Sequence, residues 1–261
     1  MGCKIIAHRG SNKEAPQNTL SAFQAAVDEK ADGFETDVHL TLDGVPVICH
    51  NYSIDDTSDG RGLVSGYTLA ELKKFDFGSY FGERFRGTSA PTLDEFLFFV
   101  SKTSAEIINI ELKCPADRVY ELAKKTLDCV KKNGVLDRVI ISSFSPALLR
   151  AVKAVDARCK TAFLFPSNRP SVCRAVFFNP FIIVKSTAAA AIHPMSVLVT
   201  PFMVKTAHKL GVKVNVWTVN DEKSVLRLLK MGVDGIITDC PGKVRSIVQK
   251  YESGEYNVSR K

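Results

Sequence analysis

Short apolar runs alternate with segments of helical periodicity along most of the 261-residue chain. The first apolar run, Lys4–Ala7, predicts a buried strand, and Thr19–Lys30 then spaces its apolar residues along one face of a helix. Phe34–Leu40 alternates apolar and polar residues and predicts a second strand. Val45–Cys49 follows a Leu-Asp-Gly turn, so it predicts either a hairpin partner for that strand or its continuation.

The alternation resumes after residue 91 and continues almost to the C-terminus. Further strands are predicted at Glu106–Leu112, Arg138–Ser142, Lys160–Phe165, Ile182–Lys185, Val212–Thr218 and Gly235–Thr238. Further helices are predicted at Thr92–Lys102, Ala116–Lys132, Pro146–Val155, Val172–Phe178, Pro201–Lys209, Asp221–Met231 and Gly242–Tyr251. Repeated strand–helix units indicate a parallel sheet, and about eight such strands favour a closed TIM-type (β/α)8 barrel of the α/β class.

Residues 51–91 interrupt this pattern. They are rich in Gly, Ser and Asp and contain one helix-like piece, Leu69–Lys74. We interpret the segment as a small insertion on one barrel loop, after the second strand, where it can help to shape a substrate pocket. The tail Glu252–Lys261 is polar and is expected to fray. Since neither a repeat nor a linker is visible, we interpret residues 1–261 as one domain.

Composition and charge narrow the class of protein. Hydrophobic residues make up 45% of the chain and charged residues 24%, as in folded globular domains. The net charge of +7 is spread without a dense Lys/Arg run, which favours anionic ligands and indicates no nucleic-acid partner. Neither an apolar stretch of about 20 residues nor a signal peptide is visible, so no stable membrane span is expected. No GxGxxG or P-loop sequence follows a predicted strand, so the usual nucleotide-binding motifs are absent.

The cysteines indicate a reducing compartment. There are seven of them, an odd number, scattered along the chain without a CxxC pair. This pattern indicates neither a zinc site nor a disulfide framework, because both need clustered or paired cysteines. We therefore expect reduced thiols inside a cell and a cytoplasmic protein.

Three carboxylates are predicted to meet where the barrel strands end, which is where barrel enzymes place their active sites. Glu35 and Asp37 are two positions apart on one strand, so they point to the same face, and Glu111 ends the next barrel strand. Three converging carboxylates repel one another unless a cation neutralises them, and an all-oxygen donor set suits Mg²⁺ or Ca²⁺. The alternative interpretation is a salt-bridge cluster with Arg9 and Lys113.

Two histidines accompany this cluster. His8 follows the first strand and His50 follows the hairpin strand. Histidine carries protons near neutral pH, so a pair facing carboxylates indicates general acid–base chemistry, although a single strand-end histidine is commonly structural. Arg9 and Lys113 supply fixed positive charge for a phosphate. The set is typical of phosphodiester chemistry.

Taken together, these motifs resemble those of the glycerophosphodiester phosphodiesterase family, over nearly the whole chain. The matching segments are His8-Arg9-Gly10, Pro16-Gln17-Asn18-Thr19, Glu35-Thr36-Asp37-Val38, Pro46–His50, Thr92-Leu93-Asp94-Glu95, Glu111-Leu112-Lys113, Val214–Asn220 and Gly232–Pro241. The resemblance implies a TIM-type barrel that hydrolyses small-molecule glycerophosphodiesters to glycerol 3-phosphate and an alcohol. It implies metal ligands at Glu35, Asp37 and Glu111, acid–base roles for His8 and His50, and phosphate binding by Arg9 and Lys113.

Two positions depart from the family pattern. Gln17 stands where Glu is usual, and Asn51 stands where Asp usually follows the second histidine. Each departure removes one negative charge near the site while sparing the histidines and the three carboxylates, so catalysis is still expected. Three other side chains are candidates for the substrate pocket: Trp217, Asn18 and His39. His39 is two positions after Asp37, so it could face the same side of the strand. His193 and His208 are expected to be structural or exposed.

Other functions remain open at this point. A lysophospholipase D-like or sphingomyelinase D-like enzyme would need an apolar ramp, and residues 51–91 contain the aromatic side chains for one, among them Phe75 and Phe77. Those side chains could equally form a small packed core. A barrel that binds a phosphodiester without cutting it would have no need of two proton carriers. The sequence names neither the alcohol, the metal nor the oligomeric state.

Overall fold

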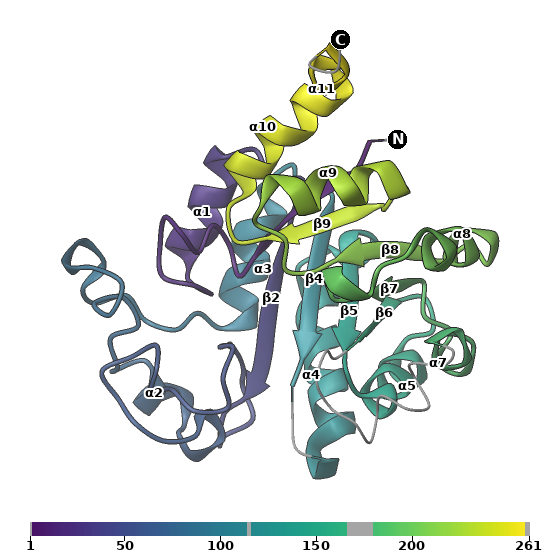
Figure 1. The fold of residues 1–261 in the computed structure, drawn as a ribbon. Helices are drawn as coiled ribbons and strands as arrows, with labels where there is room; N and C mark the ends of the chain where they lie inside the picture. The colour runs from purple at the N-terminus through teal and green to yellow at the C-terminus, as the bar shows by residue number, and fades with distance from the viewer. Residues whose placement is uncertain (1, 114–115, 166–179, 259–261) are drawn as a thin grey trace.

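Eight parallel strands form a closed barrel in the computed structural model, which describes residues 2–113, 116–165 and 180–258 (Figure 1). The ring closes because β1 (Lys4–His8) pairs with β9 (Gly235–Thr238) on one side and β2 (Gly33–Leu40) on the other. The other barrel strands are β4 (Ile107–Leu112), β5 (Val139–Ser143), β6 (Lys160–Leu164), β7 (Ala191–His193) and β8 (Lys213–Val216). The predicted TIM barrel is confirmed.

Helices cover the outside of the barrel (Figure 1). They are α1 (Leu20–Asp28), α3 (Leu93–Ser101), α4 (Val119–Lys132), α5 (Pro146–Val155), α7 (Pro180–Thr187), α8 (Pro201–Lys209), α9 (Glu222–Met231) and α10 (Pro241–Glu252). Local sequence sets where they begin. Thr92 and Glu95 form a reciprocal capping box at the start of α3, and α5, α8 and α10 carry proline in their first turn, where its missing N–H costs nothing. No helix among the described residues is long and apolar enough to cross a membrane.

Alternating side chains separate a hydrophobic shell around the strands from an interior that carries the polar site residues above a small apolar cluster of Ile140, Ala162 and Ala191. On β2, Phe34 and Val38 belong to the core between strands and helices, whereas Glu35 and Asp37 take the opposite face. Phe34 packs edge-on against Phe23 of α1, with ring centroids 5.9 Å apart. Burial of this apolar shell stabilises the frame that carries the polar side chains at the strand ends.

Residues 51–91 lie beside the barrel, next to the hairpin strand β3 (Pro46–Ile48), which pairs antiparallel with β2 (Figure 1). The predicted helix in this segment forms as α2 (Leu69–Leu72), capped by Thr68 and Glu71. A separate apolar cluster holds the segment together; its buried residues are Val47, Cys49, Ile54, Val64, Leu72, Phe77 and Ala90, with Tyr67, Leu69 and Phe75 packed against them.

One prediction about secondary structure is wrong, and another falls on residues that the structure does not describe. Ile182–Lys185 was predicted to be a strand but lies inside α7, and the strand of that unit is the short β7. A brief run of β-branched residues fits a buried strand and a buried helix equally well, so its hydrophobic period does not distinguish the two. In the polar tail, Glu255–Val258 forms α11, where the Tyr256 hydroxyl donates to Glu222 at 2.6 Å. The predicted helix at Val172–Phe178 lies outside the described residues.

Candidate active site

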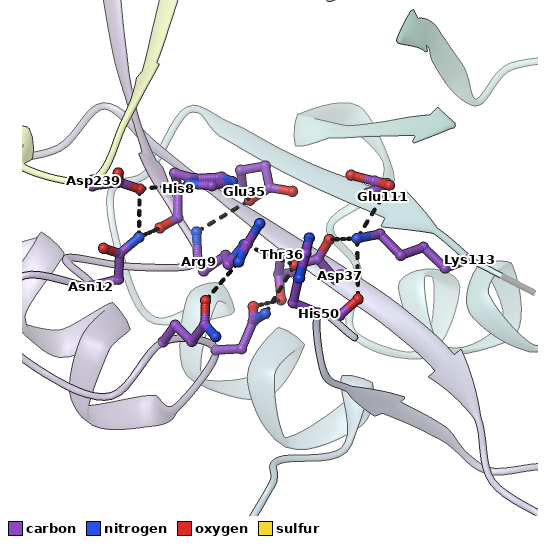
Figure 2. A network of polar contacts seen from close by, with 12 residues as sticks. His8, Arg9, Asn12, Glu35, Thr36, Asp37, His50, Glu111, Lys113 and Asp239 are labelled. Carbon is purple, nitrogen blue, oxygen red and sulfur yellow. Dashed lines mark hydrogen bonds and ion pairs between the residues drawn. The ribbon is translucent and has the colours of Figure 1, made fainter. Parts of the chain in front are cut away.

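The three predicted carboxylates converge at the carboxyl ends of β2 and β4 (Figure 2). Strand register explains why: Asp37 is paired with Glu111 across the two strands, and His8 of β1 is paired with Glu35. One oxygen from each of the three carboxylates lies within 4.8 Å of the others, and all three residues are buried. Side chains that are far apart in sequence are therefore gathered by the parallel order of three adjacent strands.

Two cations lie against this cluster. Lys113 Nζ is 2.7 Å from Asp37 Oδ1 and 3.5 Å from Glu111 Oε1, and Arg9 Nε is 3.4 Å from Asp37 Oδ2. Three carboxylates facing two cations leave one negative charge in excess when all are ionised. Asp37 is thus surrounded by a salt-bridge cluster, whereas Glu35 and Glu111 are less completely neutralised.

The pKa values follow this division. Burial raises the pKa of Glu35 well above its usual value, and the charges of Asp37 and Glu111 raise it further. Burial, with Asp37 next, raises the pKa of Glu111 to about 7. Burial also acts to raise the pKa of Asp37, but Lys113 and Arg9 outweigh it and hold that pKa below its usual range. Two carboxyls therefore resist ionisation until more positive charge arrives. A divalent cation would supply it, and three buried carboxylates are a donor set that fits Mg²⁺ or Ca²⁺.

A carboxylate that sequence reasoning gave no role, Asp239, holds His8. The Nδ1 atom of His8 lies 2.6 Å from Asp239 Oδ1, and Asn12 donates to the same oxygen at 2.6 Å (Figure 2). Asn220 donates to the other oxygen of this carboxylate, also at 2.6 Å. An ionised carboxylate only accepts, so Nδ1 carries the proton and Nε2, 3.9 Å from Glu35 Oε2, is left to react. The signal was present in the sequence, since Asp239 directly follows the last strand, as His8 follows the first.

His50 has a different partner from that of His8. Its Nδ1 is 2.6 Å from Oδ1 of Asn51. Its backbone carbonyl accepts from Lys113 Nζ at 3.2 Å and from His39 Nε2 at 3.3 Å. Burial lowers the pKa of both His50 and His39 to about 4. His39, a candidate for the substrate pocket, thus contacts the backbone of His50 and the ring of Tyr52 rather than the cavity.

The turn after β1 shapes the phosphate side of the site. Arg9 has a positive φ of 58° and Gly10 one of 82°; a Cβ on Gly10 would lie 2.5 Å from the backbone of Ala22, so only glycine fits there. Arg9 Nη1 donates to Gln17 Oε1 at 2.7 Å. The neutral amide of Gln17, where a glutamate was expected, therefore still orients the guanidinium of Arg9. Asn18, 4% exposed, donates to Asp37 Oδ2 at 2.9 Å and lies behind that carboxylate.

A cavity of about 180 Å³ opens over these groups. It has a charged side and an apolar side, and its lining consists of His8, Arg9, Glu35, His50, Asn109, Glu111, Lys113, Phe144, Leu164, Trp217 and Ile237. Trp217 packs edge-on against Phe144, with ring centroids 5.8 Å apart, and donates its Nε1–H to the carbonyl of His193. Within the described residues, the buried Oδ1 of Asn109 has no hydrogen-bond partner, although Asn109 lines the cavity. The arrangement suits a small ligand with an anionic end and a partly apolar end.

The two remaining histidines lie away from the cavity lining, as predicted. His193 is fully buried in the barrel, where Asn215 Nδ2 lies 3.0 Å from its Nε2, and burial lowers its pKa to about 3. His208 pairs with Asp234 at 2.8 Å, at a partly exposed position.

Comparison with known proteins agrees with this geometry. The model of the Glycerophosphoryl diester phosphodiesterase family matches residues 8–243. A glycerophosphodiester phosphodiesterase of Caldanaerobacter subterraneus subsp. tengcongensis is 37% identical over 246 residues, covering 94% of this chain and 98% of the relative. One of Bacillus altitudinis is 34% identical over 246 residues, covering 94% of this chain and 97% of the relative.

Solved structures show the same likeness. A phosphodiesterase of Oleispira antarctica, solved in complex with the product sn-glycerol-3-phosphate, is 29% identical with a TM-score of 0.86, covering 95% of this chain and 97% of that chain. A glycerophosphodiester phosphodiesterase of Thermotoga maritima is 25% identical with a TM-score of 0.72, covering 95% of this chain and 99% of that chain. The family match begins at His8 and ends beyond Asp239, so it contains the whole site. This chain therefore belongs to the glycerophosphoryl diester phosphodiesterase family.

Proposed function

We propose that this protein is a metal-dependent phosphodiesterase that hydrolyses glycerophosphodiesters to sn-glycerol 3-phosphate and an alcohol. The observation that carries the proposal is the convergence of three buried carboxylates, within 4.8 Å of one another, beside two histidines and two cations at one cavity. Family membership supports the activity, and the product in the related Oleispira antarctica structure supports the identity of the phosphate-containing product.

Glu35, Asp37 and Glu111 would hold the divalent cation, Mg²⁺ or Ca²⁺. When bound, such an ion polarises the phosphoryl oxygen and offsets negative charge that develops there. Arg9 and Lys113 flank the same carboxylates and line the cavity, so they are placed to hold the phosphate oxygens. Cationic groups fixed in advance at this position stabilise the transition state without rearranging during the reaction.

The two histidines divide the proton transfers. His8 accepts a proton at Nε2 from the attacking oxygen, and Asp239 stabilises the imidazolium that forms, because its carboxylate bonds the opposite nitrogen. His50 protonates the leaving alkoxide, which departs poorly as an anion. Burial lowers the pKa of His50, so the anionic phosphodiester must favour the protonated form for this step. The attacker is either water or the neighbouring glycerol hydroxyl, which would proceed through a cyclic phosphate.

The apolar side of the cavity would receive the glycerol. Trp217 and Phe144 form one wall, and Asn109 lines the cavity with them. A volume of about 180 Å³ fits glycerol phosphate better than an acyl chain. Phe75 and Phe77, which an apolar ramp would need, pack instead with the separate cluster of residues 51–91. This favours glycerophosphodiesters over the lysophospholipase D-like and sphingomyelinase D-like alternatives.

The proposal also covers the domain organisation, the partner and the cellular location. Residues 1–261 would act as one catalytic domain, with residues 51–91 as an insertion at the mouth, and the partner is a small molecule. A cytoplasmic location rests on the odd number and scatter of the seven cysteines. The direct experiment is glycerol 3-phosphate release from a panel of glycerophosphodiesters, with and without a chelator; a non-catalytic binding barrel would release none.

A further inference from the structure

We propose that Asp56 is a positioning residue for His50, which it reaches through the side-chain amide of Asn51. The inference rests on the proposed function, because it assigns a device that prepares one of the two proposed proton carriers. The three residues form a chain of two hydrogen bonds. Asn51 Nδ2 donates to Asp56 Oδ2 at 2.8 Å, and Asn51 Oδ1 lies 2.6 Å from His50 Nδ1.

Donor and acceptor chemistry fixes the direction of this chain. An ionised carboxylate only accepts, so Asp56 must face the NH₂ end of the Asn51 amide. The amide oxygen is then turned toward His50, and since that oxygen also only accepts, Nδ1 of His50 must carry the proton. Nε2 is then the nitrogen that takes up, and later delivers, the proton for the leaving alkoxide, while Nδ1–H keeps donating to Asn51. Asp56, exposed on residues 51–91, thereby selects the tautomer of a histidine that lines the cavity.

The backbone of His50 is held independently. Its carbonyl accepts from Lys113 and His39, neither of which forms part of the Asp56 chain. Loss of Asp56 should therefore release the orientation and tautomer of the ring without displacing the loop. If Asp56 merely supported the loop, its loss would change the ring of His50 and the position of the loop together.

The partners of the two histidines differ, which is why His50 needs a third residue such as Asp56 and His8 does not. The partner of His8 is the carboxylate of Asp239, which accepts whichever way it is turned. The partner of His50 is an amide, whose two ends differ, so a third group has to choose between them. A carboxylate at position 51 would face Asp56 across about the same short distance, and two such charges repel. Asn51 and Asp56 are therefore a matched pair.

The test exchanges members of this pair. Asp56→Ala leaves the amide free to turn, and Asp56→Arg forces the amide oxygen toward the new donor and its NH₂ toward His50. We expect kcat on glycerophosphocholine, or on the best substrate found, to fall about threefold or more for the first and tenfold or more for the second, with KM within about threefold. Asp56→Asn should recover most of the alanine loss, because its amide oxygen can still accept from Asn51.

Asn51→Asp gives the sharpest result. By itself it should lower kcat about tenfold, because it places a second carboxylate beside Asp56. The double variant Asn51→Asp with Asp56→Arg should regain most of the parent kcat, since the new carboxylate accepts from His50 and pairs with the arginine. Asp55→Ala is the matched control: this neighbouring carboxylate accepts from Gly62 N at 2.7 Å within the same loop and does not contact Asn51. It should keep the parent kcat.

The tautomer can be read directly by ¹⁵N NMR of the imidazole nitrogens, because the chain has only five histidines and His50→Ala identifies the signal. The parent and Asp55→Ala should show Nδ1 protonated in neutral His50, and Asp56→Arg should show Nε2 protonated. This readout does not depend on the substrate, so it separates failure of the inference from failure of the proposed function. An unchanged tautomer in Asp56→Arg, or an Asn51→Asp variant as active as the parent, would overturn the inference.

Discussion

His8 and Asp239 are 231 positions apart in sequence, yet His8 Nδ1 lies 2.6 Å from Asp239 Oδ1 (Figure 2). The contact forms where the barrel closes, because β1 pairs in parallel with β9 and each residue lies at the carboxyl end of its strand or just beyond it. Burial acts to raise the pKa of Asp239, but hydrogen bonds from His8, Asn12 and Asn220 hold that pKa below its usual range. The carboxylate is thus kept ionised, and its charge becomes available to His8 only in the closed barrel.

Asp239→Asn should lower kcat by at least about 10²-fold, because an amide can offer its NH₂ to His8 and favour the wrong tautomer. The measurement is kcat together with the midpoint of thermal unfolding. Asp234→Asn is the control, since Asp234 also pairs with a histidine, His208, but away from the cavity. A kcat within threefold of the parent value would show that Asp239 is a structural partner only.

His8→Ala and His50→Ala should each lower turnover of the natural substrate by at least about 10²-fold. A p-nitrophenyl phosphodiester has a leaving group that departs without a proton, so it should rescue the variant that lacks the acid. We expect the rescue in His50→Ala and not in His8→Ala. Small and equal losses in both variants would return the two histidines to a structural role and leave the cation as the main catalytic group.

Glu35→Gln, Asp37→Asn and Glu111→Gln should each weaken binding of Mg²⁺ or Ca²⁺ and lower turnover while the barrel stays folded. Removal of one carboxylate ligand typically costs about tenfold or more in affinity. Calorimetric titration of the metal-free protein measures the affinity, and circular dichroism checks the fold. Glu106→Gln serves as a control, because Glu106 is exposed and pairs with Lys4 away from the cavity. Parent-like metal affinity in all three variants would refute the ligand assignment.

The metal-free protein should also show the raised pKa of Glu111, about 7, in its stability. A carboxyl whose pKa is higher when folded contributes stability below its unfolded pKa and loses it as the pH rises through the folded value. Between about pH 5 and pH 8, the free energy of unfolding of the parent should therefore fall by about 1–3 kcal/mol relative to Glu111→Gln.

Urea unfolding of both proteins in the presence of a chelator measures this difference. The comparison matters because His39 and His50, whose pKa values burial lowers to about 4, contribute in the opposite direction and are shared by both proteins. Their stability is present above the unfolded pKa and is lost as the pH falls. A difference that does not change with pH would mean that Glu111 is ionised throughout.

Much of the fold and the centre of the site followed from local pattern. Glu35, Asp37 and Glu111 could be placed together because period-two alternation and parallel strands fix both the face and the end of the sheet. Ile182–Lys185 was assigned wrongly, because three apolar residues followed by a lysine are too short to show a period, and the helix that contains them packs against α5 and β6.

The partners of the histidines were the least predictable part. Asp239 and His8 meet only where β1 pairs with β9, and the contacts of Asn51, in a loop, and His39, near the end of β2, depend on the directions of their side chains. A sequence can mark such residues as polar and close to a strand end. It does not state which of their atoms donate and which accept, because that depends on three-dimensional contacts that have no fixed spacing.

The most direct test of the central claim is the release of glycerol 3-phosphate from glycerophosphodiesters that differ in their alcohol, assayed after exhaustive chelation and again after Mg²⁺ or Ca²⁺ is restored. We predict that the chelated protein is inactive, that one of these cations restores glycerol 3-phosphate release, and that Glu35→Gln remains poorly active at the same cation concentration. Full activity of protein in which elemental analysis detects no metal, or no release of glycerol 3-phosphate from any member of the panel with either cation, would contradict the account.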